Sequence, residues 1–171
     1  MTVETFKIEV LPLKNRLYRF ASRLVKNVPE AEDIVQEVFM RLWARKERLS
    51  EYRSIEAFAM TITKNLCLDK LKSKKNKADE LTIKNEQISG TTPYRMLELN
   101  DSYKKVQEIM QLLPEQQKMI MHLRDIEEYE FEEIAEIMNL TINTIRVNLS
   151  RARKKVRETL IKTYSYEFAE N

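Results

Sequence analysis

Hydrophobic residues recur at helical spacing in two stretches of the chain, and a polar stretch separates them. The first stretch predicts three helices. The first helix carries apolar positions from Phe6 to Leu24 and contains Pro12, where we expect a kink or a helix start. Pro29 suits the first turn of the second helix. The third begins near Ser54 and has apolar residues on two nearly opposite sides, so we expect neighbours to cover both.

The polar stretch from Ser73 to Pro93 breaks this periodicity and contains Gly90, the one glycine of the chain. We interpret it as a flexible linker between two domains. The predicted organisation is a first domain over residues 1–75, a linker over 76–93 and a second domain over 94–171.

The second hydrophobic stretch predicts a helix opened by Thr92 and Pro93 and a short helix that starts at Pro114. Two further helices follow, with a turn at Asn139 between them. The 171 residues include one Gly and four Pro, which leaves few helix breakers. The predicted fold class is therefore all-α, with two small helical domains.

The turn at Asn139 lies in a segment with the spacing of a helix-turn-helix, EFEEIAEIMNLTINTIRVNLSRAR. We expect Ile134, Ala135 and Met138 on the inner face of its first helix, where the small Ala135 lets the second helix cross closely. Asn tolerates the left-handed backbone that such a turn requires. Thr141 is a good N-cap for the second helix.

The second helix of this motif has an apolar side and a basic side. The apolar side carries Ile142, Ile145, Leu149, Ala152, Val156 and Leu160. The opposite side carries Asn143, Arg146, Val147, Ser150, Arg151, Lys154 and Arg157. Short polar groups and Arg suit base edges in a major groove, and the later basic residues suit phosphates. The alternative is an ordinary amphipathic helix with a solvated basic face, preceded by the acidic stretch DIEEYEFEEIAE.

Candidate enzyme chemistry is sparse in this sequence. The single Cys67 excludes an internal disulfide, and one Cys with one His cannot form the usual zinc site. A single Gly excludes a P-loop or a GxGxxG motif. We expect His122 at a helix surface or boundary, Cys67 as a small buried residue, and the carboxylates as helix-surface charge. No enzyme activity, metal or cofactor is predicted.

The sequence also bears on the compartment. No apolar run approaches the ~18 residues of a membrane span. The N-terminus lacks the basic start and apolar stretch of a signal peptide. We therefore expect a cytoplasmic protein with no direct membrane insertion.

Three segments resemble the extracytoplasmic-function (ECF) sigma factors, and the resemblance covers nearly the whole chain. The C-terminal segment, LLPEQQKMIMHLRDIEEYEFEEIAEIMNLTINTIRVNLSRARKKVRETL, resembles their fourth conserved region. The segments AEDIVQEVFMRLWARKERL and IEAFAMTITKNLCLDKLKSKK resemble their second region. The sequence of the first domain also resembles the sigma factors of Bacteroidetes. The resemblance implies a protein that binds core RNA polymerase, directs it to promoters and helps to open the −10 region.

The resemblance also implies roles for particular residues. On the helix from Ala31 to Trp43, the candidates for binding the polymerase clamp are Asp33, Gln36, Glu37 and Arg41. For the single-stranded −10 element, where one base is flipped into a pocket, the candidates are Leu49, Arg53, Lys64, Asn65, Asp69 and Lys72. For the −35 duplex they are Asn143, Thr144, Arg146, Val147, Asn148, Ser150, Arg151 and Lys154. The simpler alternatives are helix-dipole charges, surface acids and a solvated lysine-rich helix end.

The chain departs from the family in two places, which comprise three residues. Many members have Ser-Arg where this chain has Val147 and Asn148, and many have Gly where Glu128 stands. Family members are commonly held inactive by an anti-sigma factor, often membrane-anchored, so such a partner is expected beside core polymerase and promoter DNA. Two other functions stay open: a helix-turn-helix regulator that acts without polymerase, and an all-helical protein-binding adaptor.

Overall fold

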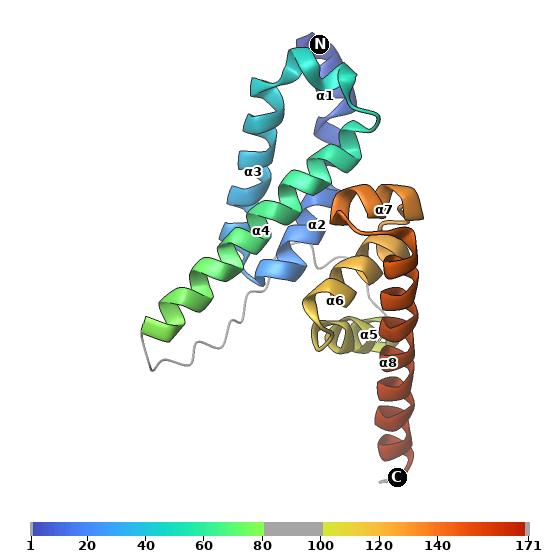
Figure 1. The fold of residues 1–171 in the computed structure, drawn as a ribbon. Helices are drawn as coiled ribbons and strands as arrows, with labels where there is room; N and C mark the ends of the chain where they lie inside the picture. Colours follow the sequence, from blue (N-terminus) through green and yellow to red (C-terminus); the bar gives the residue numbers. More distant parts are fainter. Residues whose placement is uncertain (1, 81–100, 170–171) are drawn as a thin grey trace. The chain divides into compact units, whose positions relative to one another are not determined.

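The computed structural model describes residues 2–80 and 101–169, and every regular element within these ranges is a helix. This confirms the predicted all-α fold class. The chain divides into two compact units, Met1–Thr92 and Pro93–Asn171, and each is described by itself (Figure 1).

The first unit opens with short helices and continues with three longer ones. They are α1 (Val3–Glu9), η1 (Leu11–Leu13), α2 (Lys14–Val25), α3 (Val28–Ala44), η2 (Lys46–Glu51) and α4 (Ile55–Glu80). Pro12 lies in η1, a 3-10 turn between α1 and α2, so the helical pattern is interrupted where the proline predicted a kink.

Side chains next to the helix ends explain where α3 and α4 begin. Lys26 ends α2 in the left-handed conformation, with φ 52°. Asn27 then caps α3, its Oδ1 accepting the Glu30 N–H at 2.9 Å, and Pro29 stands in the first turn as expected. The Ser54 hydroxyl accepts the Ala57 N–H at 3.1 Å at the start of α4.

Helices α2, α3 and α4 pack against one another around the core of this unit (Figure 1). Its fully buried side chains include Leu17, Phe20, Ala31, Val38, Leu42, Leu49, Met60 and Cys67. On α4, Ala59 and Ile62 are buried as well as Met60 and Cys67. This confirms that α4 is covered on two sides.

Helix α4 continues to Glu80, past residue 76, where the predicted linker begins. Its last turns read SKKNKADE, without Gly or Pro. Polarity suggested a linker, but the exposed end of a helix is equally polar, and Lys, Ala and Glu favour helix. Residues 81–93 of the predicted linker, and the predicted helix start at Thr92 and Pro93, lie outside the described residues. The domain limits at 75 and 94 stay a prediction.

The second unit holds the helix-turn-helix. Its elements are α5 (Asp101–Gln111), α6 (Glu115–Met121), η3 (His122–Ile126), α7 (Phe131–Met138) and α8 (Ile142–Ala169). Helix α8 packs against α5, α6 and α7 (Figure 1). Its buried side chains are Ile145, Leu149, Ala152 and Val156, which belong to the predicted apolar side. On α7, Ile137 is buried with Ile134 and Met138, whereas Ala135, predicted on the same inner face, is only partly buried.

The histidine was predicted at a helix surface or boundary. His122 stands where α6 ends and η3 begins, but it is buried, so the surface alternative was wrong. His122 and Glu127 are each 2% exposed, and the His122 Nε2 lies 3.2 Å from the Glu127 Oε1. Both belong to the segment around η3, a π-helical turn. A π turn holds more residues than an α turn, so a period extrapolated from α6 assigns these side chains to the wrong side. Glu127 is also an exception to the expectation that carboxylates provide surface charge.

The backbone at Glu128 is left-handed, with φ 60°. A residue with a Cβ is strained there, whereas glycine is not. The family's frequent glycine at this position therefore has a physical reason, and this chain keeps the conformation without it.

Candidate nucleic-acid and polymerase interfaces

The turn between α7 and α8 has the predicted geometry. Asn139 is left-handed, with φ 52° and ψ 50°, and its N–H donates to the carbonyls of Ala135 and Glu136. The Thr141 hydroxyl accepts the Thr144 N–H at 3.2 Å. This N-cap fixes where α8 begins, and therefore which of its side chains are exposed.

Most of the predicted −35 residues lie on the exposed side of α8. The exposed ones are Asn143, Arg146, Val147, Ser150, Arg151 and Lys154, and the partly buried ones are Thr144 and Asn148. The Asn148 Nδ2 donates to the Thr144 carbonyl at 2.9 Å, so this amide binds its own helix. Val147 is 40% exposed and presents an apolar group among polar ones.

The acidic stretch before α8 serves mostly internal contacts. Glu130 and Glu133 form a capping box at the start of α7. Asp125 accepts two hydrogen bonds from Arg153 of α8, one of them from Nε at 3.0 Å. The hydrogen bond to Asp125 raises the pKa of Arg153 above its ordinary value. Much of this acidic charge therefore stabilises the motif, and it partly neutralises one arginine of the basic helix.

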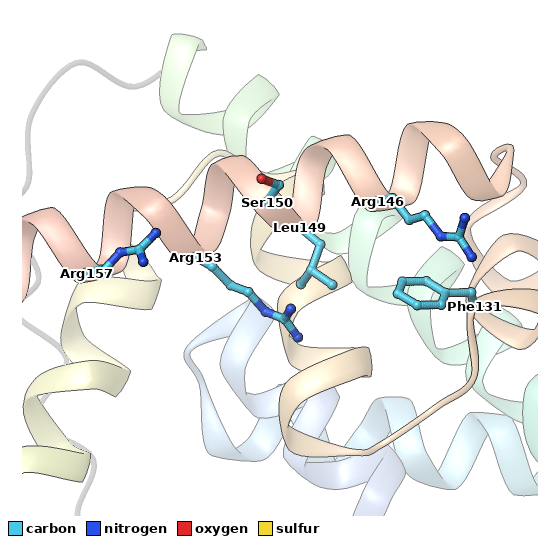
Figure 2. A pocket seen from close by; sticks show the side chains of 6 residues that line it. All are labelled: Phe131, Arg146, Leu149, Ser150, Arg153 and Arg157. Carbon is cyan, nitrogen blue, oxygen red and sulfur yellow. The ribbon is translucent and has the colours of Figure 1, made fainter.

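An open groove of about 290 Å³ runs beside α8. Its lining residues are Phe131, Arg146, Leu149, Ser150, Arg153 and Arg157 (Figure 2). The Phe131 ring lies 5.1 Å from the guanidinium carbon of Arg146 and 4.8 Å from that of Arg124. No sequence pattern singled out Phe131, Arg124 or Arg153 as functional residues. Asp125 and Arg153 are 28 positions apart, so no local pattern reveals their pairing.

The predicted polymerase-binding residues share the solvent side of α3. Asp33, Gln36 and Arg41 are exposed and Glu37 is partly exposed. The Arg41 Nε lies 2.7 Å from the Glu37 Oε1, one helical turn away. The same helix exposes two large apolar side chains, Met40 at 66% and Trp43 at 39%.

Two of the predicted −10 residues are not available for contact in this structure. Leu49 is 0% exposed because η2 turns its side chain into the core, and this corrects its assignment to the DNA surface. Lys64 is only 9% exposed, and burial lowers the pKa of its amine. The other four, Arg53, Asn65, Asp69 and Lys72, are exposed.

Tyr52, which precedes Arg53 in the sequence, forms an aromatic pair that no sequence pattern indicated. Tyr52 stacks on Phe58 with ring centroids 3.9 Å apart and an interplanar angle of 17°. The guanidinium carbon of Arg45 lies 5.9 Å from the Phe58 ring centre. Tyr52 keeps 36% of its surface exposed and lies between Leu49 and Arg53, two of the predicted −10 residues. Stacked rings of this kind are suitable platforms for unpaired bases.

Residues 2–80 and 101–169 lack two other kinds of site. No group of three or more His, Cys, Asp or Glu side chains could hold a metal ion. No helix in the same part of the chain is both long and apolar enough to cross a membrane.

Known proteins resemble both units. Residues 10–77 match the family described as Sigma-70 region 2, and residues 103–156 match Sigma-70, region 4. The ECF RNA polymerase sigma factor SigW of Bacillus subtilis is 26% identical over 157 residues, which cover 86% of this chain and 84% of that protein. RNA polymerase sigma factor SigV of the same organism is 30% identical over 151 residues, which cover 87% of each.

Solved structures agree with these matches. The sigma factor RpoE of Bartonella quintana, solved with the anti-sigma factor NepR, has a TM-score of 0.75 and 26% identity. The alignment covers 92% of this chain and 98% of that one. CnrH, solved with the cytosolic domain of CnrY, has a TM-score of 0.67 at 17% identity and shares the fold. From its two sigma regions and its full-length relatives, the chain belongs to the sigma-70 family and is an ECF RNA polymerase sigma factor.

Proposed function

We propose that this sigma factor reads the −35 element of its promoters with the exposed side of α8. The observation that carries the proposal is the start of this helix. A left-handed Asn139 and a capping Thr141 precede it, and Arg146, Val147 and Arg151 are exposed on its first turns. Arg can bind guanine through two hydrogen bonds, and Val can meet a thymine methyl group.

Arg146 and Lys154 have different roles in this proposal. Replacing Arg146 by Ala should remove the preference for one base pair, worth ~1–3 kcal/mol. Replacing Lys154 by Ala should weaken binding to all sequences alike and flatten the salt dependence. Binding of the polymerase holoenzyme to specific and scrambled promoters at several salt concentrations separates the two effects. Equal losses on both DNAs for both variants would contradict this division.

The single-stranded −10 element is assigned to exposed residues along α4 and in the loop before it. Flipping a base out of the duplex costs a few kcal/mol, which stacking and hydrogen bonds must offset. Tyr52 offers the stacking surface, Asn65 can donate and accept on a base edge, and Asp69 accepts from an amine. Lys72 suits a phosphate. Leu49 and Lys64 are left out because they are buried.

The exposed side of α3 is assigned to core RNA polymerase, with Asp33, Gln36, Glu37 and Arg41 as contacts. This surface combines charged groups with the exposed apolar side chains of Met40 and Trp43, a mixture common in protein interfaces. A variant with Gln36→Ala and Glu37→Lys should lose affinity for core polymerase. Unchanged affinity, measured with labelled chain in solution, would contradict the assignment.

In-vitro transcription tests the whole proposal. Purified chain and core polymerase would be incubated with a library of genomic fragments, and the start sites sequenced. We expect a small set of start sites that share −35 and −10 elements and require the added chain. A polymerase-independent regulator would instead bind duplex DNA tightly by itself. An adaptor protein would show no salt-dependent DNA binding. Absence of chain-dependent start sites would refute the proposal.

The relative from Bartonella quintana was solved with an anti-sigma factor. By analogy we propose that this chain also has an anti-sigma partner, which binds it in the cytoplasm and keeps it from polymerase. We propose no cofactor and no catalytic role for the chain. Affinity capture with tagged chain should recover such a partner, and the purified partner should abolish chain-dependent transcription. A captured protein without this effect would not be an anti-sigma factor.

A further inference from the structure

We infer that Phe131 is a positioning residue, which holds the guanidinium of Arg146 in place for base recognition. The inference rests on the proposed role of α8 in reading the −35 element. Arg146 extends from α8 toward the first residue of α7, and its guanidinium carbon lies 5.1 Å from the Phe131 ring centre (Figure 2). A cation at this distance from an aromatic ring is attracted by it.

The Phe131 ring is held by its own segment. Phe131 is the first residue of α7, directly after the Glu130 that forms the capping box with Glu133. On the preceding segment, the Arg124 Nη1 donates to the Tyr129 carbonyl at 2.7 Å and lies 3.3 Å from a Glu130 oxygen. Tyr129 is buried, at 2% exposure. The ring is therefore attached to the core of the unit, although it comes from a different helix than Arg146.

Arg124 does not displace Arg146 from the ring, because its charge is used elsewhere. Its guanidinium carbon lies 4.8 Å from the Phe131 ring centre, but its hydrogen bond to Tyr129 and its pairing with Glu130 fix it on its own segment. Two cations close to one ring would otherwise repel each other. Within the described residues the guanidinium of Arg146 has no such ion pair or hydrogen bond, so it is the cation that the ring can orient.

Orientation matters for an arginine that reads bases. The side chain has several rotatable bonds, and two parallel hydrogen bonds to guanine require one orientation of the planar group. A ring beside it reduces the conformations to be lost on binding. Arg151, five positions later on the same exposed side, has no aromatic contact within the described part of the chain. It provides an internal comparison.

The test measures base preference rather than activity alone. A promoter library randomised across the −35 element would be transcribed by core polymerase with the full chain, and the preference at each position obtained by sequencing. Arg146→Ala identifies the position that Arg146 reads, and Arg151→Ala the position that Arg151 reads. We expect Phe131→Leu to lower the preference at the Arg146 position about two- to fivefold, the strength of an exposed cation–π contact. The Arg151 position should not change.

Two further variants separate positioning from mere stability. Phe131→Tyr keeps the ring and should keep the preference. In an Arg146→Ala background, Phe131→Leu should cause no additional loss, since its effect acts through Arg146. The inference would be overturned if the loss persisted in that background, or if it spread evenly over all positions.

A spectroscopic measurement covers the case in which Phe131→Leu does not fold. The Arg146 Nε–H resonance of the intact chain, assigned by its disappearance in Arg146→Ala, should be shifted by the ring current of Phe131. A resonance at the usual position would overturn the inference. If the unmodified chain gave no polymerase-dependent start sites, the proposed function itself would fail, which is a distinct result.

Discussion

The two long helices α4 and α8 carry most of the residues assigned here to DNA, but their positive charge resides on different side chains. The basic residues of α4 are all lysines: Lys64, Lys70, Lys72, Lys74, Lys75 and Lys77. Helix α8 has the arginines Arg146, Arg151, Arg153 and Arg157 beside the lysines Lys154, Lys155 and Lys162. A guanidinium is a planar fork with fixed geometry, whereas an ammonium is a compact point charge on a flexible stem.

The two helices also differ in the contacts that their basic side chains make. On α8, Asp125 binds Arg153 and Phe131 contacts Arg146. On α4 the exposed lysines Lys70, Lys72 and Lys75 lie beyond the stacked rings of Tyr52 and Phe58 in the sequence. Oriented arginines suit the fixed base edges of a duplex, while lysines and a stacking platform suit a single strand of variable shape. Four experiments test this difference between α4 and α8.

The largest effect is expected from exchanging the two basic side chains. Arg146→Lys keeps the charge but removes the fork, and should lower the preference for its base pair by ~1–3 kcal/mol. Lys72→Arg on α4 is the matched exchange and should leave base preference unchanged. Sequencing of transcripts from randomised promoters measures both. If α8 tolerated its exchange as well as α4, orientation of the guanidinium would have no importance.

The next largest effect is expected at Glu128, in the segment before α7 that also contains Asp125, the partner of Arg153. Glu128 is left-handed, so Glu128→Gly should relieve strain and raise the free energy of unfolding of the second unit by about 1 kcal/mol. Hydrogen exchange of buried amides in α7 and α8 measures the gain, and amides of α4 serve as the internal reference. Glu128→Ala, which keeps the Cβ, should give no such gain. An equal gain with Ala would attribute the effect to the lost carboxylate.

A smaller effect is expected from the lysines of α4. Lys72→Ala should remove one phosphate contact, which lowers by ~0.7 the slope of log affinity against log salt concentration for single-stranded −10 DNA. At 0.1 M salt this corresponds to about fivefold weaker binding. Base preference should stay the same, because a phosphate contact carries no sequence information. Titrations of holoenzyme with −10 single strands of different sequence at several salt concentrations measure both the slope and the base preference. A change in base preference would show that Lys72 touches a base.

The smallest effect is expected from Glu158, which lies 3.8 Å from Lys154 through Oε1 and Nζ. This pair is exposed and worth only ~0.3–0.5 kcal/mol. Glu158→Gln should free Lys154 for phosphate and raise duplex affinity about twofold, equally for all sequences. The same titration on specific and scrambled duplexes measures it. A gain on one sequence alone would mean that Lys154 reads bases.

Local signals in the sequence were sufficient for the helix-turn-helix. Asn139 in the turn, Thr141 at the cap and the apolar period of α8 each act within a few residues, so the sequence alone determines them. The interruption at Pro12 and the start of α4 at Ser54 are of the same kind.

The sequence did not predict which side chains become buried when segments distant along the chain pack together. Leu49 and Lys64 were assigned to a DNA surface by resemblance, but their exposure depends on how η2 and α4 pack on the other helices. His122 was expected at a helix surface or boundary and the carboxylates on helix surfaces, but His122 and Glu127 are both buried beside a π turn that no sequence pattern indicated. The pairing of Asp125 with Arg153 joins segments 28 positions apart. Only a three-dimensional structure supplies that information.

The buried thiol of Cys67 has a practical consequence. Burial raises its pKa to about 12, so at pH 7 about one molecule in 10⁵ carries the thiolate that reacts with alkylating dyes. The natural chain is therefore nearly silent toward such reagents, and an added surface cysteine would be the one labelled site. Ser50→Cys, on the exposed part of η2, would place a fluorophore beside the proposed base-capturing loop and let promoter opening be followed in real time.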